Sequence, residues 1–207
     1  QQLGQGYYQE IELREGLWLA VANYQLHDCI ILKSPEREHI LEYCFYLCGH
    51  LSWESGMAVG AGEYILCGSG MAPQETLCES AKQPILEVNV HLTPELFCSY
   101  VGELPKPLQP LLRKSDREYY IRSGTTTTAM QIALQQILQC PYGGLVKRMY
   151  LESKVWELLS LLLEPIVEES QKSTHYSKLN SKDIERIHHA REILLQNLDN
   201  PPSLLQL

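Results

Sequence analysis

The chain has 207 residues, of which 44% are hydrophobic and 20% are charged, a composition typical of a soluble globular protein with one large or two small domains. Its net charge of -8 would repel phosphate, so the chain is not expected to hold DNA by itself. Its longest apolar stretch, residues 155–167, is broken by Glu157, Glu164 and Pro165, which argues against a membrane span, and no secretory signal is visible at the start.

Up to about His91 the sequence pattern predicts short β-strands. The predicted strands are apolar and partly aromatic, and they cover residues 17–24, 40–47, 64–67 and 84–92. Glycine-rich breaks lie between them, at Gly56, Gly60, Gly62, Gly68 and Gly70. Short strands joined by glycine turns are typical of a β-sandwich or β-barrel, although a flexible loop would also explain the glycine cluster.

From Thr93 onward the hydrophobic period becomes helical. Thr93, Pro94 and Glu95 predict a helix start, because a hydroxyl cap, a proline in the first turn and an early acid all favour one. Three prolines between residues 105 and 110 then interrupt the chain. Residues 126–140 predict a second helix, which ends at the Cys-Pro-Tyr-Gly-Gly segment that begins at Cys140.

Residues 145–170 predict a third and longer helix, which Pro165 is expected to kink or end. The helix carries a broad apolar stripe, formed by Leu151, Val155, Leu158, Leu159, Leu162 and Ile166. We expect this helix to pair with that of a second copy in a homodimer. The alternative is that the stripe covers the strands of its own chain.

A polar linker is predicted at residues 171–178, and a fourth helix begins after Asn180. One face of this helix carries Ile184, Ile187, Arg191, Leu194 and Leu198. Pro201 and Pro202 stop it, and Ser203 would cap a fifth helix. Because a single apolar turn has nothing to pack on, the natural protein is expected to continue beyond Leu207.

Four segments resemble a known family of bacterial regulators. The last part of the chain, IERIHHAREIL at residues 184–194 and NPPSLLQL at residues 200–207, resembles the opening of an AraC-type DNA-binding domain. Two further segments resemble the siderophore-responsive, PchR-like branch of these AraC-type transcription regulators. They are LESKVWELL at residues 151–159 and GYYQEIELREGL at residues 6–17.

The resemblance implies an α+β fold with three parts. A cupin-like β-barrel that senses an effector would occupy residues 1–92, and a helical dimerisation bundle residues 93–172. A linker and the first helix of a helix-turn-helix domain would occupy residues 173–207. The implied protein is a cytoplasmic homodimer that is not an enzyme and that binds promoter DNA through a region beyond Leu207, so no DNA-contacting residue can be named here.

A metal-dependent cupin enzyme is one alternative. Glu42 and Gly49 fit the second half of the first cupin motif, but the two preceding histidines are missing and His39 stands alone. No histidine lies near Pro73, where the histidine of the second motif would fall. One carboxylate without imidazoles is a poor ligand set for zinc or iron. The sequence therefore predicts no metal or other cofactor, and it places Glu42 in solvent or in hydrogen bonds.

A cysteine-based metal or redox sensor is a second alternative. The seven cysteines are Cys29, Cys44, Cys48, Cys67, Cys78, Cys98 and Cys140. They form no CxxC pair and are expected to be free thiols in a reducing cytosol. Cys44 and Cys48 would share one strand face roughly 13 Å apart, which is too far for a disulfide. A sensor would need cysteines from different strands.

Three aromatic residues are the predicted effector-binding residues: Trp18, Tyr24 and Tyr46. Trp18 and Tyr24 fall on one face of the first predicted strand, where Ala20 and Ala22 leave space between them. Aromatic walls in a small barrel would suit an aromatic ferric siderophore. The alternative is that these side chains fill the core or an interface.

Overall fold

The computed structural model describes residues 3–114 and 118–176, with side chains up to Glu169. Contacts divide the chain into a compact unit that ends at Val167 and a second unit that starts at Glu168. The predicted fourth helix, the start of the fifth and the segment that resembles a DNA-binding domain lie outside the described residues.

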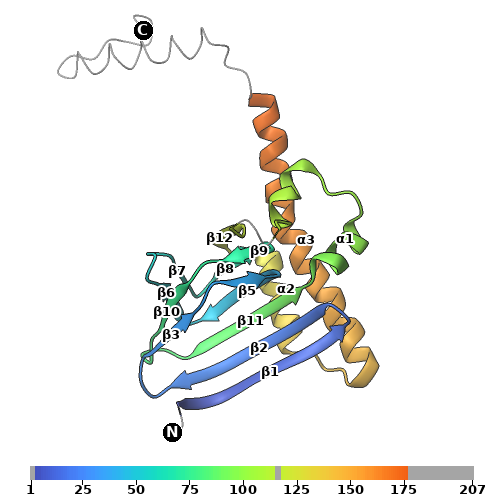
Figure 1. Ribbon diagram of the computed structural model, residues 1–207. Coiled ribbons are helices and arrows are strands. Elements are labelled where there is room, and N and C mark those ends of the chain that lie inside the picture. Colours follow the sequence, from blue (N-terminus) through green and yellow to red (C-terminus); the bar gives the residue numbers. More distant parts are fainter. Residues whose placement is uncertain (1–2, 115–117, 177–207) are drawn as a thin grey trace, which may run out of the picture. The chain divides into compact units, whose positions relative to one another are not determined.

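The strands form three antiparallel sheets (Figure 1). The large sheet contains, in spatial order, β1 (Gly4–Arg14), β2 (Leu17–Leu26), β11 (Ile85–Leu92), β5 (Leu41–Cys48), β8 (Glu63–Cys67) and β12 (Ile121–Thr125). The second sheet contains β3 (Ile30–Ser34), β10 (Glu75–Glu79), β6 (His50–Trp53) and β7 (Ala58–Gly60). The third pairs β4 (Arg37–His39) with β9 (Gly70–Ala72).

The expected α+β class, with strands first and helices after them, is confirmed. The four predicted strands correspond to β2, β5, β8 and β11. Two details differ from the expectation. Within the described residues the hydrogen bonds form separate sheets and do not close one barrel. In addition, β12 follows the first helices and completes the large sheet by pairing with β8, so the strands are not confined to the first half of the chain.

The first helix begins where its capping residue predicts, and the second begins close to its predicted start. Thr93 accepts a hydrogen bond from the Leu96 amide at 3.3 Å and starts α1 (Pro94–Val101). The proline-rich segment forms a 3-10 turn, η1 (Lys106–Leu111), and Thr127 caps α2 (Thr128–Leu138). The last helix, α3 (Gly144–Tyr176), continues past Pro165 and into the segment where a linker was expected. None of the helices in the described ranges is sufficiently long and apolar to cross a membrane.

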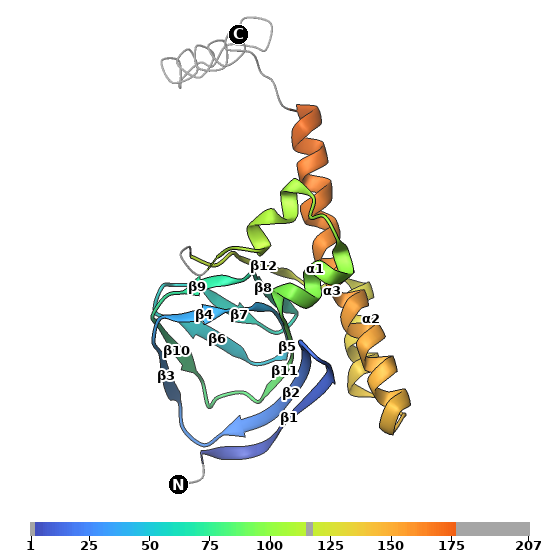
Figure 2. The same cartoon turned by 45° about the vertical axis from the view of Figure 1, so that its right-hand side comes forward.

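The two faces of the large sheet differ in chemistry, as β11 shows. Val88 and Val90 are fully buried and belong to a core cluster shared with the helices. Glu87, Asn89 and His91 alternate with them and therefore lie on the opposite face. Figures 1 and 2 show α2 and α3 on one side of the large sheet, with the second sheet on the other. The helices thus pack on the apolar face of the large sheet, and the polar face is directed toward the second sheet.

The apolar stripe of α3 covers the strands of its own chain, as the alternative interpretation held. Its residues are buried in the same cluster as the apolar side chains of β5 and β11 that face the helices. The Tyr43 hydroxyl on β5 donates a hydrogen bond of 2.9 Å to the Val155 carbonyl of α3. Trp156 stacks on Tyr100 of α1, with ring centroids 4.0 Å apart. The stripe is consequently not available as a dimer surface.

Replacing Tyr43 by Phe should lower the free energy of unfolding by about 1 kcal/mol, because a buried hydrogen bond between β5 and α3 is lost while the ring is kept. Urea unfolding at neutral pH measures the difference. Tyr7 is 52% exposed on β1, and Tyr7→Phe is the control that should change little. An equal effect of the two substitutions would contradict a role for the Tyr43 hydroxyl.

Candidate functional site

A cavity of about 190 Å³ lies between the polar face of the large sheet and the second sheet. Cys44 and Tyr46 of β5 line one side, and Trp53 of β6 and Leu77 of β10 line the other. A second hollow of about 430 Å³ shares Trp53 and several other lining residues with it, so the two adjoin. Because both sheets contribute to the wall, a bound molecule would contact both.

The structure brings one of the three predicted aromatic residues to this cavity. Tyr46 is buried and lines it. Tyr24 shares the same face of the sheet but donates a 2.9 Å hydrogen bond to Glu79 of β10, and it does not line the cavity. Trp18 lines a separate, open hollow beside Thr93 at the start of α1. Effector binding by these three residues stays a prediction.

Several lining residues were not predicted from the sequence. Trp53 lies in a glycine-rich region whose short strands carry a weak pattern, and Arg37 lies on a strand of only three residues. Tyr119 precedes β12, which falls among the helices. The polar face of β11 had a readable signal, because Glu87 and His91 alternate with buried aliphatic residues.

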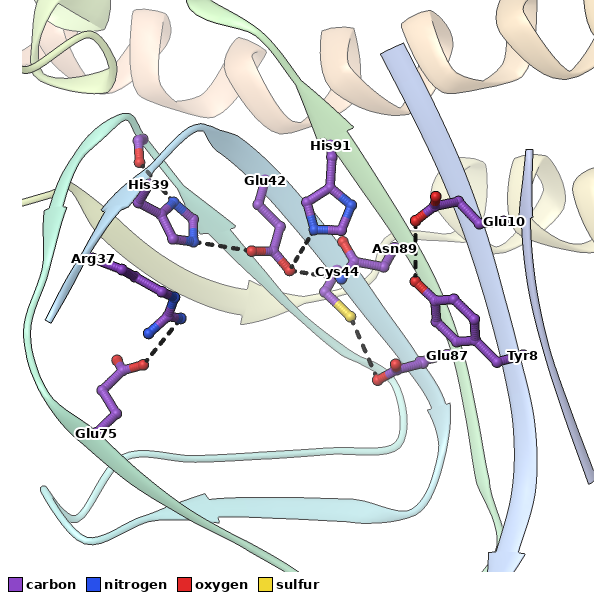
Figure 3. A network of polar contacts seen from close by, with 11 residues as sticks. Tyr8, Glu10, Arg37, His39, Glu42, Cys44, Glu75, Glu87, Asn89 and His91 are labelled. Carbon is purple, nitrogen blue, oxygen red and sulfur yellow. Dashed lines mark hydrogen bonds and ion pairs between the residues drawn. The ribbon is translucent and has the colours of Figure 1, made fainter. Parts of the chain in front are cut away.

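A network of polar contacts surrounds Glu42 at one end of the cavity (Figure 3). His39 Nε2 lies 3.0 Å from Glu42 Oε2, and its Nδ1 lies 3.3 Å from the Gly68 carbonyl oxygen. Asn89 Nδ2 donates to Glu42 Oε1 at 2.6 Å, and His91 Nε2 lies 3.6 Å from the same oxygen. Both partners of His39 are acceptors, so the protonated imidazole satisfies both contacts at once.

The charges of this network stabilise each other. Burial opposes the charged form of His39, but the hydrogen bond and charge of Glu42 outweigh it and raise the pKa of His39. Burial likewise opposes ionised Glu42, yet His39, His91 and Asn89 lower the pKa of this carboxyl. Glu42 is thus the hydrogen-bonded strand residue that was expected. The expectation that His39 stands alone was incomplete, because the pairing of β11 with β5 adds His91.

These residues do not form a ligand set for a metal. Among residues 3–114 and 118–176, no group of three or more His, Cys, Asp or Glu side chains is arranged to hold an ion. The Glu42 oxygens are already engaged by the two imidazoles and by Asn89. The metal-dependent alternative therefore has no support from the geometry of the described residues.

Glu87 is a carboxylate of this face for which the described residues show no cationic contact. Burial, and then the nearby charges of Glu79 and Glu42, raise the pKa of Glu87 to about 7. The Cys44 thiol donates a weak hydrogen bond to Glu87 at 3.8 Å. Glu87 is therefore expected to gain or lose its proton near neutral pH.

The seven cysteines are free thiols, and two of them lie in the cavity wall. Burial, and then the neighbouring carboxylates, raise the pKa values of Cys44 and Cys67 well above the usual range. A protonated thiol is a poor nucleophile and a poor metal ligand. These two residues therefore do not suit a redox or thiolate sensor.

The substitution Glu87→Gln should make stability less dependent on pH. Because the pKa of Glu87 is raised on folding, the folded protein holds a proton that the unfolded chain releases between about pH 4.5 and 7. The free energy of unfolding of the parent protein therefore falls as the pH rises through this window. Glutamine stays neutral, so we expect the gain from Glu87→Gln to be about 2 kcal/mol larger at pH 8 than at pH 5.

Urea unfolding at both pH values measures this gain, and Glu12→Gln on the exposed face of β1 is the matched control. A gain that is equal at pH 5 and pH 8 would show that Glu87 does not carry the proton.

Comparisons with known proteins agree on a regulatory domain. The family described as the N-terminal domain of the regulatory protein PchR matches residues 3–179. Regulatory protein PchR of Pseudomonas aeruginosa is 31% identical over 122 residues, which cover 59% of this chain and 40% of PchR. The chain thus spans well under two thirds of the length of this relative.

Solved structures give more distant likenesses. ToxT from Vibrio cholerae has a TM-score of 0.44 at 11% identity, over 73% of this chain and 57% of that chain. A cupin protein from Bacteroides fragilis has a TM-score of 0.32 at 13% identity, over 51% of this chain and 86% of that chain. The family assignment depends on the sequence match alone. Because that match extends over residues 3–179, which are most of the chain, the chain belongs to the family of PchR-type regulatory N-terminal domains.

Proposed function

We propose that this chain is the effector-sensing and dimerising part of an AraC-type transcription regulator, with a small molecule bound between its two larger sheets. The cavity beside Tyr46 and Trp53 is the observation that supports this role most directly. An aromatic and apolar wall with a few polar groups is typical of small-ligand sites. A ferric siderophore is the effector that the resemblance to the PchR-like branch implies.

Strand β5 would connect the effector to the helices. Its inward residues, Cys44 and Tyr46, line the cavity. Tyr43 and Phe45 of this strand point to the opposite face, where they are fully buried in the cluster that contains α3. Tyr43 is also hydrogen-bonded to that helix. A ligand that favours one position of β5 would thereby favour one position of α3. Such a preference shifts the population between two arrangements of the regulator.

The proposed homodimer needs a surface other than the buried stripe of α3. The first two turns of this helix expose Leu145, Val146 and Met149, which are 63%, 54% and 63% exposed. Neighbouring exposed apolar side chains of this size are typical of an interaction surface. We place the contact with the second copy there.

The complete regulator would bind promoter DNA through the helix-turn-helix part that residues 184–207 resemble. This chain carries a net charge of -8, which suits a sensor better than a DNA-binding surface. The proposal assigns no catalytic step to this chain.

Binding can be followed through tryptophan fluorescence, because Trp53 lines the cavity while Trp18 and Trp156 lie elsewhere. We expect saturable quenching by a ferric siderophore, and none by iron salts or by the iron-free siderophore. The quenching should largely disappear in Trp53→Phe and persist in Trp156→Phe. Quenching that survives in Trp53→Phe would place the ligand outside this cavity, and no response to any loaded siderophore would remove this class of effector.

Replacing Val146 by Asp should weaken self-association, because a charge would have to be buried at the proposed contact between copies. Sedimentation equilibrium of the 207-residue chain should show at least a tenfold weaker dimer, which corresponds to about 1.4 kcal/mol. Ser153→Asp, at an exposed position further along α3, is the control. Equal dimerisation of Val146→Asp and the parent protein would rule out this surface.

A further inference from the structure

Arg37 lines the cavity with part of its hydrogen-bonding capacity unused. The side chain makes one ion pair, in which Nη2 lies 3.5 Å from Glu75 Oε2, and it is 41% exposed (Figure 3). A contact of this length is at the outer limit for a hydrogen bond. A guanidinium carries several N–H donors in a planar fork that suits a carboxylate held by two bonds. Its other donors have no acceptor among the residues that the structure describes.

Other polar groups of the wall are less suited to hold an anion. Both ring nitrogens of His39 are occupied, one by Glu42 and the other by the Gly68 carbonyl. Glu42 and Glu75 are themselves acidic and would repel an anion. Within the described wall, Arg37 is thus the cationic side chain with N–H donors left for a bound anion.

Glu75 already has a second partner that would keep it in place. The Tyr119 hydroxyl donates to Glu75 Oε1 at 3.0 Å, while the weaker contact to Arg37 uses Oε2. The Tyr119 ring in turn packs on His39, with centroids 4.9 Å apart. Glu75 could therefore give up Arg37 without being left unpaired, so it acts as an internal competitor for the guanidinium.

Aromatic and apolar side chains also line the cavity. Trp53, Met57 and Tyr119 line both the cavity and the adjoining hollow. We propose that the cavity recognises a small aromatic carboxylate, whose anionic group displaces Glu75 from Arg37 while its ring packs against these side chains. This inference rests on the proposed function, because it assigns a ligand chemistry to the same cavity.

A pair of uncharged and charged probes of the same shape tests the inference. Cinnamate and cinnamamide differ in the carboxylate alone and are small enough for a cavity of about 190 Å³. Isothermal titration calorimetry of the 207-residue chain should show about tenfold tighter binding of cinnamate. Glu75→Gln removes the competitor, so it should tighten cinnamate binding several-fold and leave cinnamamide unchanged.

Substitution of Arg37 completes the test. Arg37→Gln should abolish the preference for cinnamate while cinnamamide binding persists, and that persistence shows that the variant is folded. Arg37→Lys keeps the charge but loses the fork, so it should retain part of the preference. Arg14→Gln is the matched control, because Arg14 also pairs with a glutamate, Glu152 at 3.2 Å, but lies outside this cavity.

Three outcomes would overturn the inference. Equal affinity of the parent protein for the two probes would show that the cavity does not select an anion, while small-ligand binding there would stand. A preference that survives in Arg37→Gln would place the carboxylate elsewhere. Binding of neither probe would exclude aromatic carboxylates of this size, and the siderophore titration followed through Trp53 would then decide separately whether the proposed function holds.

Discussion

The alternation of side chains across the large sheet is the constraint on which the rest of the structure depends. Every second residue of β5 and β11 is apolar and faces the helices, and the residues between them lie on the opposite face, where Glu42, Cys44 and Tyr46 of β5 line the cavity. The helices α2 and α3 cover the first face, so the other is left for the second sheet and the cavity between them. A shift of one residue in the pairing of β11 with β5 would place Glu87 and His91 in the helical core.

The cavity face tolerates its charges because most of them are paired. Glu42 is surrounded by two imidazoles and an amide, and these partners offset the cost of removing the carboxylate from water. Glu87 is hydrogen-bonded to the Cys44 thiol and not to a cation. Its pKa is raised to about 7. Arg37 differs from these groups, because its single long contact leaves it able to change partners.

The sequence predicted the framework better than the site. Strong periodic segments, such as residues 84–92 and the long third helix, identified the central strands and the apolar stripe of α3. Tyr46 was found because it lies on a long strand with a clear pattern. Trp53 and Arg37 were missed because their strands have four residues or fewer, which is too short for a period to be read. Pairing between distant strands, which brings His91 to Glu42, is not visible in a local pattern.

Strand β5 contributes side chains both to the hydrophobic core and to the cavity wall, and this has a consequence for genetic selections. Substitutions in this strand would disturb the hydrophobic core and the sensor together, because neighbouring residues serve opposite faces. A selection for regulators that ignore their signal would therefore collect many β5 variants that are merely unstable. Variants of Trp53, Met57 and Tyr119 would be more informative, because these residues pack beside the cavity cluster and are not part of the helical core. The sensor of such a regulator can thus evolve toward new ligands along this edge while the scaffold stays unchanged.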